Sequence, residues 1–148
     1  MVILLNEVIH QMEMEDPDLI IVGSQSNSLP FEVNHVFDLT LKQWSFFMGT
    51  QPDLYILCVN PQDPDEYICR TISFLESIRN GRVIGLVLFP QVLKQEWAGF
   101  SFQNQKLSDE VYFEKMHQLS ARLNVPVYEL SECGANKLAD DIISILST

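Results

Sequence analysis

Short polar side chains follow an apolar run near the start of the chain, and they are the first residues that could bind a ligand. The apolar run covers residues 19–22 and ends at Gly23. The polar residues after it are Ser24, Gln25, Ser26 and Asn27. Their hydroxyl and amide groups suit a crevice that hydrogen-bonds a small neutral or weakly anionic ligand. The alternative is ordinary turn chemistry, in which Ser and Asn bond their own backbone.

Three more candidate ligand-binding residues lie further along the chain. Asn60 and Asp63 follow a second apolar run at 54–59. Asp63 can also act as a helix cap, with proline next to it and Glu66 three residues later. Cys133 precedes Gly134 at a predicted helix start, where the helix dipole favours the thiolate form of a cysteine. An unreactive cysteine in a capping loop is the other interpretation.

The apolar runs predict the strands that would position these residues. Each run is short, rich in branched residues and without polar alternation, which is typical of a strand buried on both faces. We expect four parallel strands centred near Ile21, Ile56, Leu86 and Val127, with Pro126 placing the last strand at an edge. Because parallel strands end at the same edge, their polar carboxyl ends should form one crevice.

Helical patterns alternate with these runs, so the predicted fold is a three-layer α/β/α domain with a four-stranded parallel sheet, like a Rossmann or P-loop half. Apolar spacing predicts a first helix over residues 2–14. Helices are also expected from Asp38 to Gly49, after Asp63, from Ser108 to Asn124 and after residue 131. A helix before the first strand is unusual for a doubly wound sheet. We therefore expect one domain over residues 1–148, forming the C-terminal part of a longer chain.

The charge and composition exclude several classes of protein. Nine Lys and Arg against 20 Asp and Glu give a net charge of −11 over 148 residues, which repels nucleic acids and anionic membranes. No apolar run reaches the ~20 residues that span a bilayer, and no secretion signal is visible. These features predict a cytoplasmic protein. The spacing of the three histidines and three cysteines predicts neither a metal site nor a disulfide framework, and no cofactor is expected.

Three segments resemble the C-terminal half of a P-loop NTPase-like family related to dethiobiotin synthetase and cobyrinic acid amide synthases. They are residues 18–26, residues 49–53 with the sequence Gly-Thr-Gln-Pro-Asp, and residues 57–61. The chain is also similar to a clostridial peptide-maturation accessory family. The resemblance covers residues 18–90 and implies a P-loop-like fold.

Two departures from the family pattern weaken the case for nucleotide hydrolysis. A phosphate cradle needs Gly-x-x-x-x-Gly-Lys-Ser/Thr, and none of the six glycines is followed by lysine. Val22 stands where the family has an acidic residue that would help to hold magnesium or a water. Either an N-terminal partner domain or protein supplies the cradle, or nucleotide hydrolysis is absent.

The function predicted from these features is a non-catalytic or partner-dependent NTPase-like domain, accessory to peptide or small-molecule biosynthesis. The alternative is a small-molecule enzyme or ligand-binding domain that uses the carboxyl ends of the strands without a P-loop. Enzymatic activity stays open. No Gly-x-Ser-x-Gly elbow is present, so the sequence gives no support for an acyl-transfer triad. The aromatic residues Trp97, Phe100 and Phe102 predict either a lid over the crevice or a docking strip for another protein.

Overall fold

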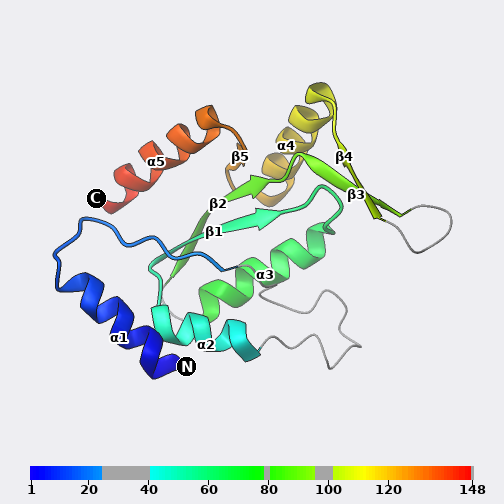
Figure 1. Ribbon diagram of the computed structural model, residues 1–148. Coiled ribbons are helices and arrows are strands. Elements are labelled where there is room, and N and C mark those ends of the chain that lie inside the picture. The colour runs from blue at the N-terminus through cyan, green and yellow to red at the C-terminus, as the bar shows by residue number, and fades with distance from the viewer. Residues whose placement is uncertain (25–40, 79–80, 96–101, 148) are drawn as a thin grey trace.

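The computed structural model describes residues 1–24, 41–78, 81–95 and 102–147, which form five helices and five strands (Figure 1). In chain order these are α1 (Val2–Glu13), α2 (Leu41–Thr50), β1 (Leu54–Val59), α3 (Asp65–Ile78), β2 (Arg82–Leu88), β3 (Gln91–Gln95), β4 (Phe102–Lys106), α4 (Asp109–Leu123), β5 (Val127–Glu129) and α5 (Glu132–Leu146).

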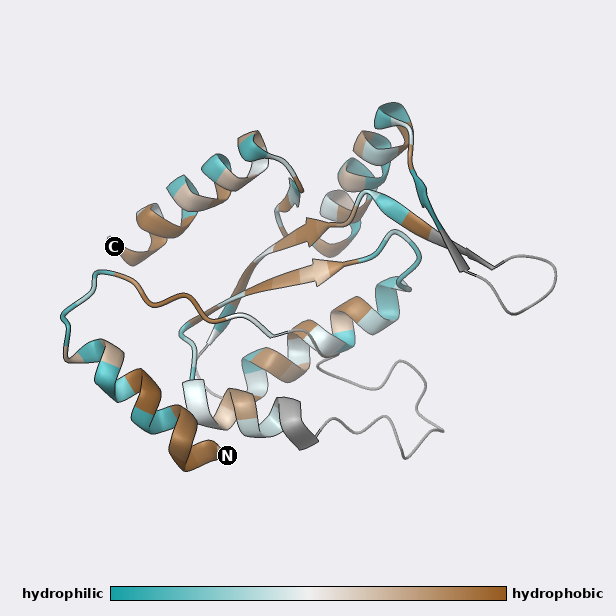
Figure 2. Cartoon of the chain, in the orientation of Figure 1, coloured by the Kyte–Doolittle hydropathy of each residue, from teal (hydrophilic) through white to brown (hydrophobic). Residues whose placement is uncertain are grey.

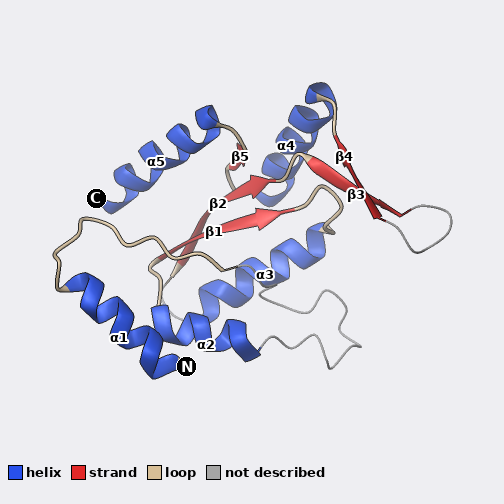
Figure 3. Ribbon diagram, in the orientation of Figure 1, coloured by secondary structure: helices blue, strands red, loops and turns tan. Residues whose placement is uncertain are grey.

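A parallel sheet of three strands forms the centre of the molecule, in the order β1-β2-β5 (Figure 3). Leu57 on β1 aligns with Leu86 on β2, and Leu86 aligns with Val127 on β5. The chain thus has the predicted α/β fold with a parallel sheet. The strand after Pro126 lies at an edge, as predicted.

The predicted first strand is wrong, so the sheet formed by the described residues has three parallel strands instead of four. Residues 19–22 run as an extended segment without strand structure. Ile21 is 81% exposed and Leu19 is 47% exposed. A strand needs a hydrogen-bonding neighbour, and none of the described strands pairs with this segment.

β1 is an edge strand among the strands described, and it is not buried on both faces as predicted. Its buried residues Tyr55 and Val59 point to one face, whereas Ile56 between them is 40% exposed. The central strand is β2, in which Leu86 and Leu88 are fully buried. Figure 2 shows apolar colouring along β1 and β2, and also along the segment that follows α1 and at the end of α5.

Helices cover the two faces of the sheet unequally. On one face α3 and α4 pack over a core that includes Ile68, Leu86 and Tyr112. The opposite side carries α5 (Figure 1), whose Asp141 accepts a hydrogen bond from the Tyr128 hydroxyl of β5 at 2.7 Å. The apolar residues in the last turns of α5 are half-buried or exposed, with Ile143 at 61% exposure.

The five predicted helices are confirmed, and one boundary differs. The hydroxyl groups of Ser108 and Ser131 cap α4 and α5, and Asn124 ends α4 in a left-handed conformation. The predicted cap Asp38 lies outside the described residues. Gly49 lies inside α2 and does not end it.

The close packing of α1 on α2 explains why a glycine stands at position 49 inside the helix. A Cβ atom at Gly49 would lie 2.5 Å from the Cβ of Leu5 in α1. Gln51 takes the left-handed conformation after the helix, with a φ of 44°.

The segment after β2 is a hairpin, although no strand was predicted there. β3 and β4 pair antiparallel, with Val92 opposite Gln105. In Figure 1 the hairpin extends away from the main sheet. Of the three aromatic residues of interest, Phe102 begins β4, while Trp97 and Phe100 lie outside the described residues, so their predicted role as a lid or docking strip stays a prediction. Among the helices described, none has the length and apolar character needed to cross a bilayer.

Candidate functional site

A cavity of about 700 Å³ runs along β1 and is the candidate site. All six residues of β1 line it. The extended segment with Leu19, Ile20, Ile21 and Val22 also lines it, followed by Ser24. This volume is in the range of small-molecule sites, which are about 300–1,000 Å³.

Helices that pack on both faces of the sheet contribute to the same cavity. Ile68 and Leu75 reach it from α3, and Ile142 and Leu146 reach it from α5. Phe46 and Phe47 of α2 and Ile9 of α1 add further apolar surface. The cavity therefore lies beside the edge of the sheet, and helices cover it from both of the sheet's faces.

Its polar part lies where β1 ends and contains three of the residues predicted from sequence. Ser24, Asn60 and Asp63 all line the cavity. Asp63 accepts a hydrogen bond from the Asn60 N–H through Oδ2 at 2.7 Å, and the Asp63 N–H donates to the Asn60 carbonyl at 3.1 Å. This reciprocal turn fixes the Asp63 side chain against the Asn60 backbone at the carboxyl end of β1. Their role in binding a ligand stays a prediction.

The other predicted residues are not brought to this place by the described structure. Gln25, Ser26 and Asn27 lie outside the described residues. Cys133 is exposed in the first turn of α5 and is not among the residues that line the cavity. Gly134 beside it packs so closely that a Cβ atom would lie 2.1 Å from the carbonyl oxygen of Glu129. This glycine serves the contact between α5 and β5.

Tyr67 also lines the cavity, although it was not among the residues predicted from sequence. It lies one helical turn after Asp63 and lines the same part of the cavity. Burial raises the pKa of its hydroxyl, and the Asp63 carboxylate raises it further. The hydroxyl therefore stays protonated at neutral pH and can donate a hydrogen bond. The spacing of four residues from a capping aspartate was the signal that could have identified it.

The charge of the cavity is negative at both ends. Glu13, Asp18 and Asp53 line the part near the start of β1, and Asp63 lines the part near its end. Among the described residues that line the cavity, none is Lys, Arg or His. Such a lining favours neutral or cationic groups over the weakly anionic ligand that the sequence suggested, because like charges repel.

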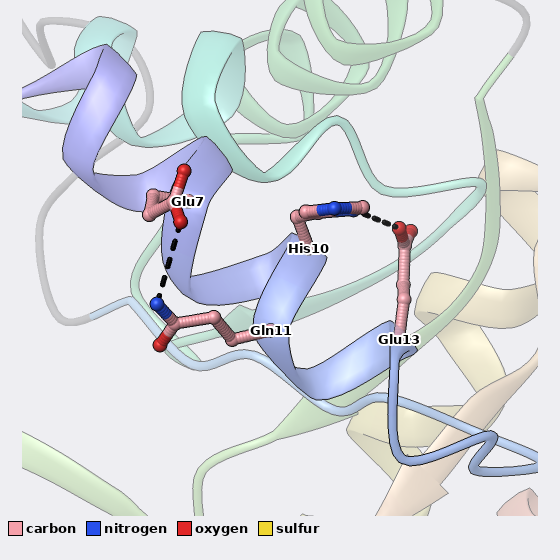
Figure 4. A network of polar contacts seen from close by, with 4 residues as sticks. All are labelled: Glu7, His10, Gln11 and Glu13. Carbon is pink, nitrogen blue, oxygen red and sulfur yellow. Dashed lines mark hydrogen bonds and ion pairs between the residues drawn. The ribbon is translucent and has the colours of Figure 1, made fainter.

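Glu13 also interacts with its own helix. His10 Nδ1 lies 3.8 Å from Glu13 Oε2, beside a hydrogen bond of 3.4 Å from Gln11 to Glu7 (Figure 4). Both partners of the His10 pair are more than 60% exposed. A pair this exposed contributes little stability.

The two basic residues near the end of β1 have partners outside the cavity. The Lys115 ammonium group donates to the carbonyl oxygen of Pro61. The Arg122 guanidinium lies 3.0 Å from the Asp65 carboxylate. Both side chains hold the start of α3 against α4. No group of three or more potential metal ligands occurs within the described part of the chain.

Comparison with known proteins gives one match. No curated protein and no solved structure matches the chain. Residues 4–139 match a family described as "Domain of unknown function (DUF1611_C) P-loop domain". This match supports the P-loop NTPase-like resemblance, whereas the relations to dethiobiotin synthetase and to clostridial peptide maturation stay predictions. Because the match covers most of its length, the chain belongs to the DUF1611 C-terminal P-loop domain family.

Proposed function

We propose that this chain is a P-loop NTPase-like domain that does not bind nucleotide alone and depends on a partner polypeptide for its phosphate cradle. One observation carries the proposal: the chain belongs to a P-loop family, yet none of its glycines is followed by lysine. Clustered backbone amides and a lysine are the main source of polyphosphate affinity in such folds. The acidic cavity lining supports the same conclusion.

The partner would be an N-terminal domain of a longer chain or a separate protein, and the present residues would form one α/β domain. An accessory role in peptide or small-molecule biosynthesis in the cytoplasm is the setting that the family resemblance suggests. The net charge of −11 supports a setting away from nucleic acids and anionic membranes.

Calorimetric titration of the chain with Mg-ATP tests the dependence on a partner. We expect no saturable binding tighter than about 1 mM, which corresponds to about −4 kcal/mol. A control titration with the Asp63→Asn variant should give the same result, since removing one carboxylate does not create a phosphate cradle. A dissociation constant near micromolar for the wild-type chain would overturn the proposal.

A second candidate function is supported by the polar part of the cavity. Ser24, Asn60 and Asp63 line one volume together with the protonated hydroxyl of Tyr67. These groups would bind a small neutral or cationic molecule without a P-loop. Thermal-shift screening with such metabolites would identify candidates for this ligand.

Variants then decide between a real ligand site and nonspecific stabilisation. A metabolite that raises the melting temperature of the wild type, but not of the Ser24→Ala/Asn60→Ala double variant, would support the ligand site. Ser77→Ala is the matched control, because Ser77 is exposed on α3 and bonds only its own helix in the contacts described. Equal shifts in all three proteins would exclude this site.

A further inference from the structure

The outer edge of β1 has backbone groups that point toward the cavity. The Arg82 N–H donates to the Asp53 carbonyl at 3.0 Å, and the Phe89 N–H donates to the Val59 carbonyl at 2.9 Å. Both acceptors are odd-numbered residues that face β2. Alternate residues of a parallel strand bond to opposite sides. Leu54, Ile56 and Cys58 therefore present their N–H and C=O groups to the other side.

The irregularity in the sheet does not change this alternation. Tyr55 aligns with Val83 and the next residue, Ile56, aligns with Gly85, so the extra residue lies in β2. The outer edge of β1 keeps a regular pattern of donors and acceptors. Within the described part of the chain no strand pairs with that edge.

The wall opposite this edge is itself a strand-like sequence without a partner strand. Residues 19–22 line the cavity along β1. In Figure 1 this part of the blue segment and β1 both advance from left to right. Ile21 at 81% and Leu19 at 47% exposure leave branched apolar surface in water. A buried position in a sheet is where such residues are normally found.

The helices on the two faces extend over the cavity without filling it. Tyr67 and Thr71 of α3 and Ile142 and Leu146 of α5 line it from their respective sides. Leu146 is 50% exposed. Both helix layers are thus in place beyond β1, while the layer between them is empty of described strands.

We infer that the cavity is a slot for one additional β-strand that lies parallel to β1, bonds to Leu54, Ile56 and Cys58, and has residues 19–22 on its other side. A small molecule would not satisfy a row of backbone donors and acceptors along six residues, whereas strand addition does so directly. The occupant is an apolar strand with basic flanks, which match Glu13 and Asp18 near one end of the slot and Asp63 near the other.

The strand slot deepens the proposed function. It rests on that function in one respect only, namely that the loop after the added strand is the phosphate-binding loop of the partner. A strand parallel to β1 ends beside Asn60 and Ser24. A phosphate-binding loop that follows such a strand would enter the polar part of the cavity. The partner invoked above would then contribute its cradle through this slot.

Amide hydrogen exchange, measured by NMR, tests the slot. In the chain alone the amides of Ile56 and Cys58 should exchange faster than those of Leu57 and Val59, which face β2. The probe is a synthetic peptide of about six valine and isoleucine residues with lysines at both ends, matching a typical strand length. We expect this peptide to slow exchange at Ile56 and Cys58 by at least on the order of tenfold. A control peptide with proline at its centre should give no protection.

The outcomes separate the alternatives. Slow exchange at Ile56 and Cys58 in the chain alone, together with slow exchange at Ile20, would mean that residues 19–22 pair directly with β1 and would overturn the slot. Absence of protection by the strand peptide at millimolar concentration would also overturn it. Neither result bears on nucleotide binding by the chain alone. Conversely, micromolar Mg-ATP binding would overturn the proposed function and leave the exchange result standing.

Discussion

The hydroxyl group of Tyr112 joins three elements at the carboxyl ends of the strands, and its removal has a cost that the structure defines. It donates to the Leu88 carbonyl of β2 at 2.7 Å and accepts from the Leu130 N–H, between β5 and α5, at 3.0 Å. The Tyr112→Phe substitution keeps the ring but leaves both backbone groups without this partner. An unsatisfied buried polar group costs about 1–3 kcal/mol.

Loss of the Tyr112 hydroxyl should lower the free energy of unfolding by different amounts through the Leu88 carbonyl and the Leu130 N–H. Leu88 is fully buried, so its carbonyl cannot find water, whereas Leu130 is 54% exposed and its N–H is closer to solvent. We therefore expect a loss of about 2–3 kcal/mol from a total of about 5–15 kcal/mol. In a chain of this size that loss lowers the melting temperature by about 5–12 °C.

Urea unfolding followed by circular dichroism measures this difference. The control is Val111→Ala, on the same helix and 45% exposed in the wild type, which should change stability by less than about 0.5 kcal/mol. If Tyr112→Phe were as stable as the control, the hydroxyl would not bridge β2 and the β5–α5 connection in solution, and the reasoning would be refuted.

Three further predictions follow from burial and packing. Leu86→Asp should abolish cooperative unfolding, because Leu86 is fully buried. Ile56→Asp should lower the free energy of unfolding by only about 1 kcal/mol, because Ile56 is 40% exposed. Equal effects of the two substitutions in calorimetry would contradict the edge position of β1. Burial and the Asp141 carboxylate raise the pKa of Tyr128 to about 12. The stability that its neutral form provides is complete below about pH 10 and is lost as the pH rises toward 12, so Tyr128→Phe should flatten the alkaline decline in melting temperature. Gly49→Val should destabilise the chain by about 1–3 kcal/mol in urea unfolding, because its Cβ would enter the α1–α2 contact.

The parts of the fold that were predictable from sequence depend on local signals. Runs of branched apolar residues identified the strands around Leu86 and Val127, and proline identified the edge strand. Side-chain caps identified the starts of two helices, because Ser108 and Ser131 bond backbone N–H groups within their own first turn. Such interactions involve residues three positions apart and need no knowledge of the rest of the molecule.

The parts that failed depend on distant neighbours. Residues 19–22 have the composition of a buried strand, but strand formation also needs a pairing partner that composition does not reveal. The same limit applies to Ile56, whose run looks like a central strand although, among the strands described, only β2 pairs with β1. The β3–β4 hairpin was missed for a different reason. Its strands are rich in glutamine and lack the apolar alternation that predicts a half-buried strand.

The candidate site was predicted in part. The rule that parallel strands end at a common edge brought Ser24, Asn60 and Asp63 into consideration, and all three line the cavity. It could not reveal Tyr67, which enters from a helix, or the exclusion of Cys133 from the lining. The negative charge of the cavity lining could not be predicted either, since only the tertiary structure places Glu13, Asp18 and Asp53 around the same cavity.

Three exposed apolar residues of this domain are brought together around one cavity. Ile21, Ile56 and Leu146 lie on three different segments, and each of them lines the same cavity. If each were exposed for an independent local reason, substitutions at one position would not change the environment of the others. If they are three walls of a single strand slot, one added strand should cover all three at once and restore the burial that their sequence patterns predict.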